Sequence, residues 1–393
     1  MASTEEHQHP EESQADTESS VSASEYEEAR ILSACERHDI EELRVLAIGP
    51  GGFLSDQLRS QAWPVLLGID ANEIINGSTE ASGSWRQLPR HRDEEQVKLD
   101  VDRSFVYYPN DNSQAQLDEK KSELSDLIKQ VLREQPYLCY FQGYHDICQV
   151  LLLVLPAGLR APAMSRLSVL RIRDFMLPTL APAIVQLRLI PDLLRAVDES
   201  LFQHLSRNEP YFALSDTLTM FAHNVQRYSD IARLFDALIA REQVFSIYVF
   251  TQIVLRRRDE LLEHEEPDML HFTLSKLPPD LDLEAVITEA ALLFDRHPPE
   301  SLRSWRHISS ASVLKTTRDP KALSRQSLRD GQELFKKQVR ELRWAERQQK
   351  MVQTVWANRT LLFTILVGVG AIYLRKTPAW AGLAAWMTRF IRN

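Results

Sequence analysis

Apolar residues recur along most of this 393-residue chain at the three- and four-residue spacing that places them on one face of an α-helix. In the range 26–46 this spacing predicts two short helices that meet near His38 and Asp39. It predicts longer helices over Leu54–Leu67 and Leu117–Arg133. Further along, it returns in stretches that end at Pro, Gly or a polar cluster, namely Met164–Met176, Ala183–Leu205, Leu214–Val225, Ile231–Ala240, Val244–Leu262, Met269–Leu274 and Leu283–Phe294. The strict alternation that marks a β-strand is nowhere convincing, so the pattern predicts an all-α domain.

One segment, Ile147–Leu155, is apolar on every side, which predicts an element enclosed by other elements. It directly follows a polar cluster made of Tyr140, Gln142, Gly143, Tyr144, His145 and Asp146. A buried segment would hold this cluster rigidly, and Gly143 permits a positive φ or a close approach to a partner. Two interpretations stay open at this point. The cluster either presents Gln142 from a tight corner, or it is a turn that caps a core helix and leaves Gln142 an ordinary surface amide.

The two ends of the chain depart from the helical pattern. Residues 1–24 are acidic and rich in Ser, Glu and Gln, with almost nothing to bury, which predicts a disordered tail. We assign the folded domain to residues 25–305. Residues 306–358 are predicted to form a basic linker, polar over Ser309–Ser327, and then a charged stem helix.

The last apolar run, Thr360–Leu374, carries no charge and predicts a transmembrane tail anchor over residues 359–376. Fifteen residues at 1.5 Å each span about 22 Å, short of the ~30 Å hydrocarbon core, although snorkelling of the flanking Arg359, Arg375 and Lys376 narrows the gap. A buried helix is the alternative interpretation. Residues 377–393 are expected to form a short interfacial segment at the far side of the membrane, with re-entry of residues 378–391 as the open alternative. The lipid bilayer is therefore one expected partner.

Charge and composition narrow the function classes. The nine acidic residues that precede Arg30 equal the formal net charge of −9, so the remainder is nearly neutral and lacks the basic balance that nucleic-acid binding requires. Three cysteines without a C-x-x-C spacing fit a reducing, cytosolic setting, and the N-terminal residues predict no signal peptide. No G-x-x-x-x-G-K-[ST] or H-E-x-x-H pattern occurs, so we expect neither a bound nucleotide cofactor nor a metal site.

Two short motifs resemble the signatures of the TBC domain, found in GTPase-activating proteins for Rab-type small GTPases. Val97, Asp100 and Arg103 match I-x-x-D-x-x-R, and Tyr140, Gln142 and Gly143 match Y-x-Q-G. The stretch 59–69, with Arg59, Trp63 and Pro64, resembles the R-x-x-x-W-P that opens such domains. The resemblance covers residues 59–299. LSKLPPDL at 274–281 and FDRHPPESL at 294–302 are most similar to the endoplasmic-reticulum-anchored branch of the family.

The resemblance implies a TBC-type helical fold and a partner, a Rab in its GTP form, which would itself bring the GTP and magnesium. It implies that Arg103 serves as an arginine finger and Gln142 as a glutamine finger, both in trans. Asp100, Tyr140, Gly143 and Asp146 would support them, with Asp100 orienting Arg103 and Asp146 holding a neighbouring backbone or arginine group. This chain would then activate hydrolysis without hydrolysing nucleotide itself. It would face the cytosol from the endoplasmic reticulum or early Golgi membrane.

Two alternatives accompany this interpretation. Arg103 could instead form a surface ion pair with Asp100 or Asp102. At the level of function, the alternative is a non-catalytic, membrane-anchored scaffold that binds a Rab without stimulating it. Arg59, Trp63 and Pro64 are expected to serve the fold in either case.

Overall fold

The computed structural model describes residues 12–70, 84–109, 113–278, 280–319 and 321–360, together with positions 364, 369, 382 and 386. Helices make up its regular structure and no strand occurs within these ranges, so the all-α prediction is confirmed. The α-helices are α1 (Glu12–Glu36), α2 (Ile40–Ile48), α3 (Asp56–Leu66), α5 (Glu94–Val101), α6 (Gln114–Glu134), α7 (Tyr144–Val154), α8 (Ala157–Arg166), α9 (Ala181–Leu187), α10 (Leu189–Val197), α11 (Glu199–Leu205), α12 (Leu214–Leu218), α13 (Tyr228–Ala240), α14 (Phe245–Arg256), α15 (Arg258–Leu262), α16 (Pro267–Leu274), α17 (Leu283–Arg296), α18 (Val313–Thr316), α19 (Ala322–Arg325) and α20 (Leu328–Ala357). The shorter helical turns are η1 (Ser84–Gln87), η2 (Leu167–Arg171), η3 (Arg173–Met176), η4 (Pro210–Ala213), η5 (Pro299–Ser301) and η6 (Arg303–His307).

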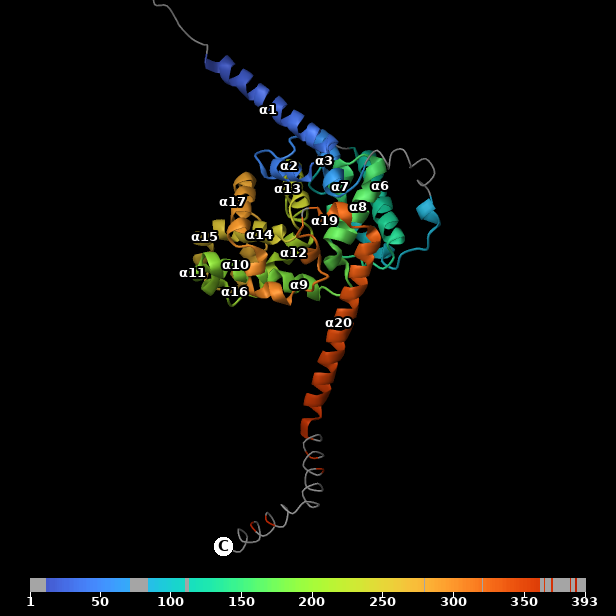
Figure 1. Ribbon diagram of the computed structural model, residues 1–393, viewed down its shortest axis with the longest axis vertical. Coiled ribbons are helices and arrows are strands. Elements are labelled where there is room, and N and C mark those ends of the chain that lie inside the picture. Colours follow the sequence, from blue (N-terminus) through green and yellow to red (C-terminus); the bar gives the residue numbers. More distant parts are fainter. Residues whose placement is uncertain are drawn as a thin grey trace, which may run out of the picture. The chain divides into compact units, whose positions relative to one another are not determined.

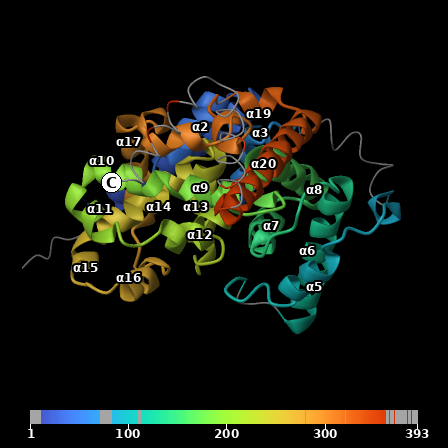
Figure 2. The ribbon, with the colours of Figure 1, turned by 90° about the horizontal axis from the view of Figure 1, so that it is seen from below.

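The described chain divides into a compact unit that ends at Lys336 and a second unit that begins at Lys337 (Figure 1). Within the first unit, α5, α6, α7 and α8 gather on one side, and α10, α11 and α14–α17 gather on the other (Figure 2). The candidate residues Arg103 and Gln142 both belong to the first of these groups, because one follows α5 and the other precedes α7.

The predicted junction of two short helices near His38 is confirmed. Helix α1 ends at Glu36 and α2 begins at Ile40, with His38 at a φ of 51° between them. Asp39 caps α2 by accepting a hydrogen bond from the backbone N–H of Glu42 at 3.1 Å. This local cap fixes where the chain reverses and brings α2 against α1.

Helix α1 differs from the prediction of a disordered tail over residues 1–24. It begins at Glu12, so the part of that tail which the structure describes is helical, and residues 1–11 lie outside the description. The physical reason is continuity, since the same helix extends to Ile31 and Ala34, both fully buried, and a packed helix propagates at little cost into flanking residues.

The apolar segment after the polar cluster forms the middle of the core, as predicted. Helix α7 contacts α3, α5, α6 and α8. Its fully buried side chains are Tyr144, Ile147, Cys148, Val150 and Leu151. The N-terminus of α7, which carries the polar cluster, is therefore held by neighbours on several sides.

Asp236 on α13 is the polar anchor of the domain's first helices. Its carboxylate accepts hydrogen bonds from Arg59 Nε at 3.1 Å, from Trp63 Nε1 at 2.8 Å and from the Phe53 backbone N–H at 3.1 Å. Asp236 and Trp63 are fully buried. The expected fold-setting role of Arg59 and Trp63 is confirmed, because together they attach α3 to α13 through one carboxylate.

The segment after residue 305 is a correction to the predicted domain boundary. Its polar residues, predicted to be linker, bind buried charges of η3: Arg173 donates to Thr316 Oγ1 at 2.9 Å, and Ser312 Oγ donates to Asp174 Oδ2 at 2.5 Å. Ala311 and Val313 are fully buried. The polar composition predicted a solvated linker, but these serines and threonines form hydrogen bonds with buried charges instead of facing water.

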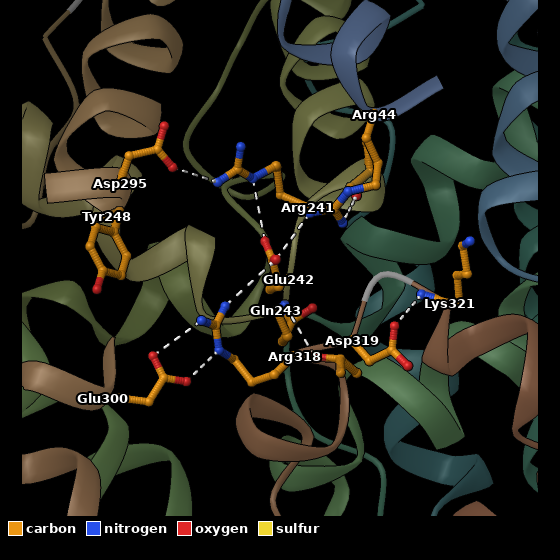
Figure 3. A network of polar contacts seen from close by, with 12 residues as sticks. Arg44, Arg241, Glu242, Gln243, Tyr248, Asp295, Glu300, Arg318, Asp319 and Lys321 are labelled. Carbon is orange, nitrogen blue, oxygen red and sulfur yellow. Dashed lines mark hydrogen bonds and ion pairs between the residues drawn. The ribbon is translucent and has the colours of Figure 1, made fainter. Parts of the chain in front are cut away.

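Figure 3 shows a second attachment of this segment, around Glu242 at the junction of α13 and α14. Arg44 of α2 lies 3.0 Å from its carboxylate, Arg241 lies 3.3 Å away and Arg318 lies 3.6 Å away. Arg318 also pairs with Glu300 at 2.7 Å. Burial opposes the charge of Glu242, but Arg44 and its neighbours outweigh burial and lower the pKa of this carboxyl. One carboxylate thus joins elements far apart in the sequence.

The predicted stem helix is present as α20, which starts at Leu328. Its first turns pack on the first unit, because Phe335 meets Tyr137 edge-on at 5.0 Å and a Cβ on Gly331 would lie 2.3 Å from Val169. Among the helices that the structure describes, none combines the length and the apolar character of a membrane span. The predicted anchor, residues 359–376, and the segment 377–393 fall almost entirely outside the described residues.

Candidate functional site

Arg103 lies in the turn that follows α5. The helix ends at Val101, and the backbone N–H of Arg103 donates to the carbonyl of Asp100 at 3.1 Å. The side chain is exposed and forms no hydrogen bond or ion pair with any other residue that the structure describes. A guanidinium in this state is solvated and available to an external anion.

Gln142 lies at the corner that leads into α7. Its side chain is exposed and, like that of Arg103, has no hydrogen-bond partner within the described ranges. The next residue, Gly143, is the N-cap of α7 with a φ of 99°, and a Cβ at this position would lie 2.5 Å from Thr219 Cγ2. Only glycine fits this corner without strain, which explains the Gln-Gly pair in physical terms.

The two side chains meet at one hollow of about 200 Å³. Its lining includes Asp100, Arg103, Gln142, His145, Asp146 and His223. We call this hollow the finger cleft. Its volume is below the ~300 Å³ typical of pockets that enclose a small molecule. The cleft therefore suits a group presented by another macromolecule better than a free ligand.

Asp100 is a structural support of the cleft, but it does not orient Arg103 as expected. Its carboxylate is buried and accepts hydrogen bonds from Tyr140 Oη at 2.9 Å and from Gln96 Nε2 at 3.0 Å. The expected pairing fails because α5 ends before Arg103, so the three-residue spacing no longer places both side chains on one face. The alternative ion pair with Asp102 is also absent among the described contacts.

Tyr140 joins the two motifs. Its hydroxyl donates to Asp100, and its backbone N–H donates to Asp93 Oδ2 at 2.9 Å. Burial and the neighbouring Asp100 carboxylate raise the pKa of the Tyr140 hydroxyl well above its ordinary value, so it remains a donor. Tyr140 thus fixes the segment before Gln142 to Asp100 in α5 and to Asp93, the residue that precedes α5.

Asp146 has different partners from those the resemblance implied. Instead of a backbone group or an arginine, it faces two histidines: Oδ1 lies 3.2 Å from His145 Nε2 and Oδ2 lies 3.0 Å from His223 Nδ1. The hydrogen bond to Asp146 raises the pKa of His223. Burial lowers the pKa of His145 and favours its neutral form. Asp146 therefore joins the start of α7 to the loop that carries His223.

Gln149, which the sequence interpretation did not single out, holds the loop after Arg103. Its Oε1 accepts the backbone N–H of Phe105 at 3.0 Å, and its Nε2 donates to the carbonyl of Tyr108 at 3.3 Å. Phe105 has a φ of 61°. A buried amide in an otherwise apolar helix was the available signal, because such a group must satisfy its hydrogen bonds somewhere.

The described residues contain no group of three or more His, Cys, Asp or Glu side chains placed to hold a metal ion. The cleft thus offers a guanidinium, a primary amide and two histidine-bound carboxylate oxygens. The guanidinium can neutralise anionic oxygens, and the amide can orient a water molecule or a polar group.

Two relatives share much of this chain. GTPase-activating protein gyp10 of Schizosaccharomyces pombe is 36% identical over 314 residues, which cover 77% of this chain and 81% of that protein. TBC1 domain family member 20 of Homo sapiens is 35% identical over 269 residues, which cover 67% of this chain and 65% of the human protein. The branch anticipated from the motifs is thereby confirmed.

A solved structure shares the fold. The Chlamydomonas flagellar RabGAP TBC domain superposes with a TM-score of 0.54 over 71% of this chain and 95% of that domain, at 15% identity. The profile of the Rab-GTPase-TBC domain matches residues 56–262, a range that includes α3, α13 and both finger motifs. From this match and from the relatives, the chain belongs to the Rab-GTPase-TBC domain family.

Proposed function

We propose that this chain accelerates GTP hydrolysis by a Rab-type small GTPase of the early secretory pathway, with Arg103 and Gln142 entering the partner's active site. One observation carries the proposal. An exposed guanidinium and an exposed amide, from two separate segments, line the same cleft and have no side-chain partner within the described chain.

Arg103 would supply positive charge. GTP hydrolysis builds negative charge on the transferring phosphoryl group, and an arginine provided in trans typically accelerates such a reaction by ~10³ to 10⁵. Guanidinium stays protonated at any relevant pH and bonds two phosphate oxygens at once, which the lysine ammonium does not do. The lack of a partner among the described residues supports this role, since none of their ion pairs must break when Arg103 meets an anion.

Gln142 would position the attacking water. A primary amide both donates and accepts hydrogen bonds, so it can hold a water by one atom and a neighbouring carbonyl by another. Such a role requires a fixed backbone. Three features fix the backbone around Gln142. Gly143 packs closely against Thr219, the backbone of Tyr140 is bonded to Asp93, and helix α7 is buried.

The rim of the finger cleft supports a protein partner. Val106 and Tyr107, which follow Arg103 and line the cleft, are 71% and 42% exposed. Apolar side chains next to a polar cleft favour contact with another protein surface. In this proposal the GTP and its magnesium ion arrive bound to that protein, and this chain needs no cofactor of its own.

The membrane location is a separate part of the proposal. The charge-free run Thr360–Leu374 supports a membrane anchor, and the LPPDL and HPPESL segments support the endoplasmic reticulum or early Golgi, with the TBC domain in the cytosol. Carbonate extraction of the full chain and of a chain ending at Asn358 tests the anchor. Equal release of the two proteins would contradict it.

The activity is tested by single-turnover hydrolysis across a panel of Rab GTPases loaded with GTP. We expect at least one Rab to be stimulated by several orders of magnitude at micromolar chain. Binding of a GTP-loaded Rab without any acceleration would instead support the scaffold alternative. Neither binding nor acceleration across the whole panel would overturn the proposal.

A further inference from the structure

The loop between α12 and α13 borders two hollows. Ala222 and His223 line the finger cleft. The next two residues, Asn224 and Val225, line a second hollow of about 240 Å³. The loop is attached to the core, because Asn224 Nδ2 donates to the buried Asp216 carboxylate at 2.8 Å. The second hollow is therefore held beside the finger cleft at a defined distance.

The opposite wall of the second hollow is apolar. Leu277, Pro278 and Leu281, from the segment between α16 and α17, line it together with Leu283, the first residue of α17, and all four are half-buried. The polar rim is internally neutralised, since Arg227 Nε pairs with Asp230 at 2.7 Å. We call this hollow the LPPDL groove. It offers hydrophobic contact without a net charge, which favours an aliphatic or aromatic side chain as its occupant.

The finger cleft alone is too small to hold a protein. A specific protein–protein interface buries roughly 800 Å² on each partner, a patch roughly 30 Å across. Neighbouring Cα atoms are only 3.8 Å apart, so the step from His223 to Asn224 is short compared with that patch. The LPPDL groove therefore lies within the reach of a globular partner that enters the finger cleft.

We infer that the LPPDL groove is a docking site for apolar side chains of the same small GTPase whose nucleotide enters the finger cleft. This inference rests on the proposed function and extends it. It assigns binding to the groove and chemistry to Arg103 and Gln142. The groove then contributes to which GTPase is accepted, because it contacts the partner's surface and not its nucleotide.

The test uses Leu281→Glu and Leu277→Glu in the full chain, with Leu292→Glu as the matched control. Leu292 is 49% exposed on α17 and lies outside the groove lining. A carboxylate in the groove must lose its hydration when a partner docks, whereas the control carboxylate stays in water. Circular dichroism and a thermal melt verify folding, and Leu281→Ala provides a milder variant at the same position.

The probe is the Rab of the panel that the wild-type chain binds best. For the two groove glutamates we expect KM for the GTP-loaded Rab to rise by roughly tenfold or more while kcat stays within about twofold. Affinity for the Rab loaded with a non-hydrolysable GTP analogue should fall by the same factor. Leu281→Ala should show a smaller rise in KM, and Leu292→Glu should match the wild type.

Groove variants that match Leu292→Glu in KM and affinity would overturn the inference while the proposed function stands. A dimeric wild-type chain that becomes monomeric in these variants, with KM unchanged, would assign the groove to a second copy and also overturn it. If the wild type binds a Rab without accelerating hydrolysis, the proposed catalysis fails and the affinities alone decide the groove. If it binds no Rab, both proposals fail.

Discussion

Arginines that connect distant elements differ from the arginine at the finger cleft in the carboxylate partners that they have. Arg44, Arg241 and Arg318 all approach the carboxylate of Glu242 (Figure 3). Elsewhere, Arg59 bonds the buried Asp236. These guanidinium groups connect helices to one another. Arg103 has no such partner among the described residues, although Asp100 and Asp102 are close in sequence.

The difference indicates which arginines serve the fold. A buried arginine without its carboxylate would be strongly unfavourable, so its partners are part of the folded structure. An exposed arginine is solvated at little cost, so its position requires another explanation. For Arg103 the explanation that we propose is an anion that a partner brings. The comparison predicts that removing a buried ion pair lowers the stability of the fold. Removing Arg103 should instead lower the rate of stimulated hydrolysis.

The largest effect is expected at the buried anchor. Asp236→Ala leaves Arg59, Trp63 and the Phe53 N–H without their shared acceptor, so the free energy of unfolding should fall by about 3–5 kcal/mol. Asp230→Ala, which removes the half-buried partner of the exposed Arg227, is the control and should cost under about 1 kcal/mol. Chemical denaturation measures both. Similar losses in the two variants would contradict the anchoring role.

Gln142→Ala should have the next largest effect, and it should change only the rate of stimulated hydrolysis. We expect stimulated hydrolysis to fall by roughly 10²-fold, equivalent to about 2.7 kcal/mol, because the water loses its positioning group. The melting temperature should not change, since the side chain is exposed and has no hydrogen bond to another described residue. Gln130→Ala, which removes an amide bonded to Glu134 on α6, is the control. Unchanged hydrolysis by Gln142→Ala would remove the amide from the mechanism.

Gly143→Ala should lower both the stability of the fold and the rate of stimulated hydrolysis. Its φ of 99° and the 2.5 Å approach of a Cβ to Thr219 predict a loss of about 1–3 kcal/mol in the free energy of unfolding. Displacement of the corner should also reduce stimulated hydrolysis. Gly158→Ala in α8 is the matched control, because nothing lies within 4 Å of its added Cβ. That control should be neutral or slightly stabilising, and a Gly143→Ala protein of unchanged stability would refute the strained corner.

The smallest effect concerns pH at the rim of the cleft. Asp146 raises the pKa of His223 above its ordinary value of 6.5, so the protonated form is favoured in the folded state. Its contribution is fully present below pH 6.5 and is lost as the pH rises through the raised value. His223→Asn should therefore cost under about 1 kcal/mol at pH 5.5 and nothing at pH 9, because the side chain is 57% exposed. Denaturation at the two pH values checks the sign.

Most of the helical pattern was predictable because local spacing and breakers determine it. The junction at Asp39 and the burial of α7 follow from residues within one or two turns of each other. The segment after residue 305 was mispredicted, because its Ser312 and Thr316 meet Asp174 and Arg173 only in three dimensions. Composition cannot distinguish a solvated hydroxyl from one that satisfies a buried charge.

In the candidate site, too, the sequence predicted some residues, whereas the contacts of others appear only in the folded structure. Arg103 and Gln142 came from two short motifs, and the structure brings them to one cleft. Their supports were less predictable. Asp100 binds Tyr140 and not Arg103, because the end of α5 lies two residues earlier than helical spacing assumes. The pairing of Asp146 with His223 joins residues 77 positions apart, which no local pattern encodes.

The most direct test of the account is single-turnover hydrolysis with Arg103→Ala on a Rab that the wild type stimulates. We predict a fall of roughly 10²-fold or more, little rescue by Arg103→Lys, unchanged melting temperature and retained binding of the GTP-loaded Rab. Near-normal hydrolysis by Arg103→Ala would contradict the central claim. The arginine without an internal partner would then not be the one that acts on the phosphates.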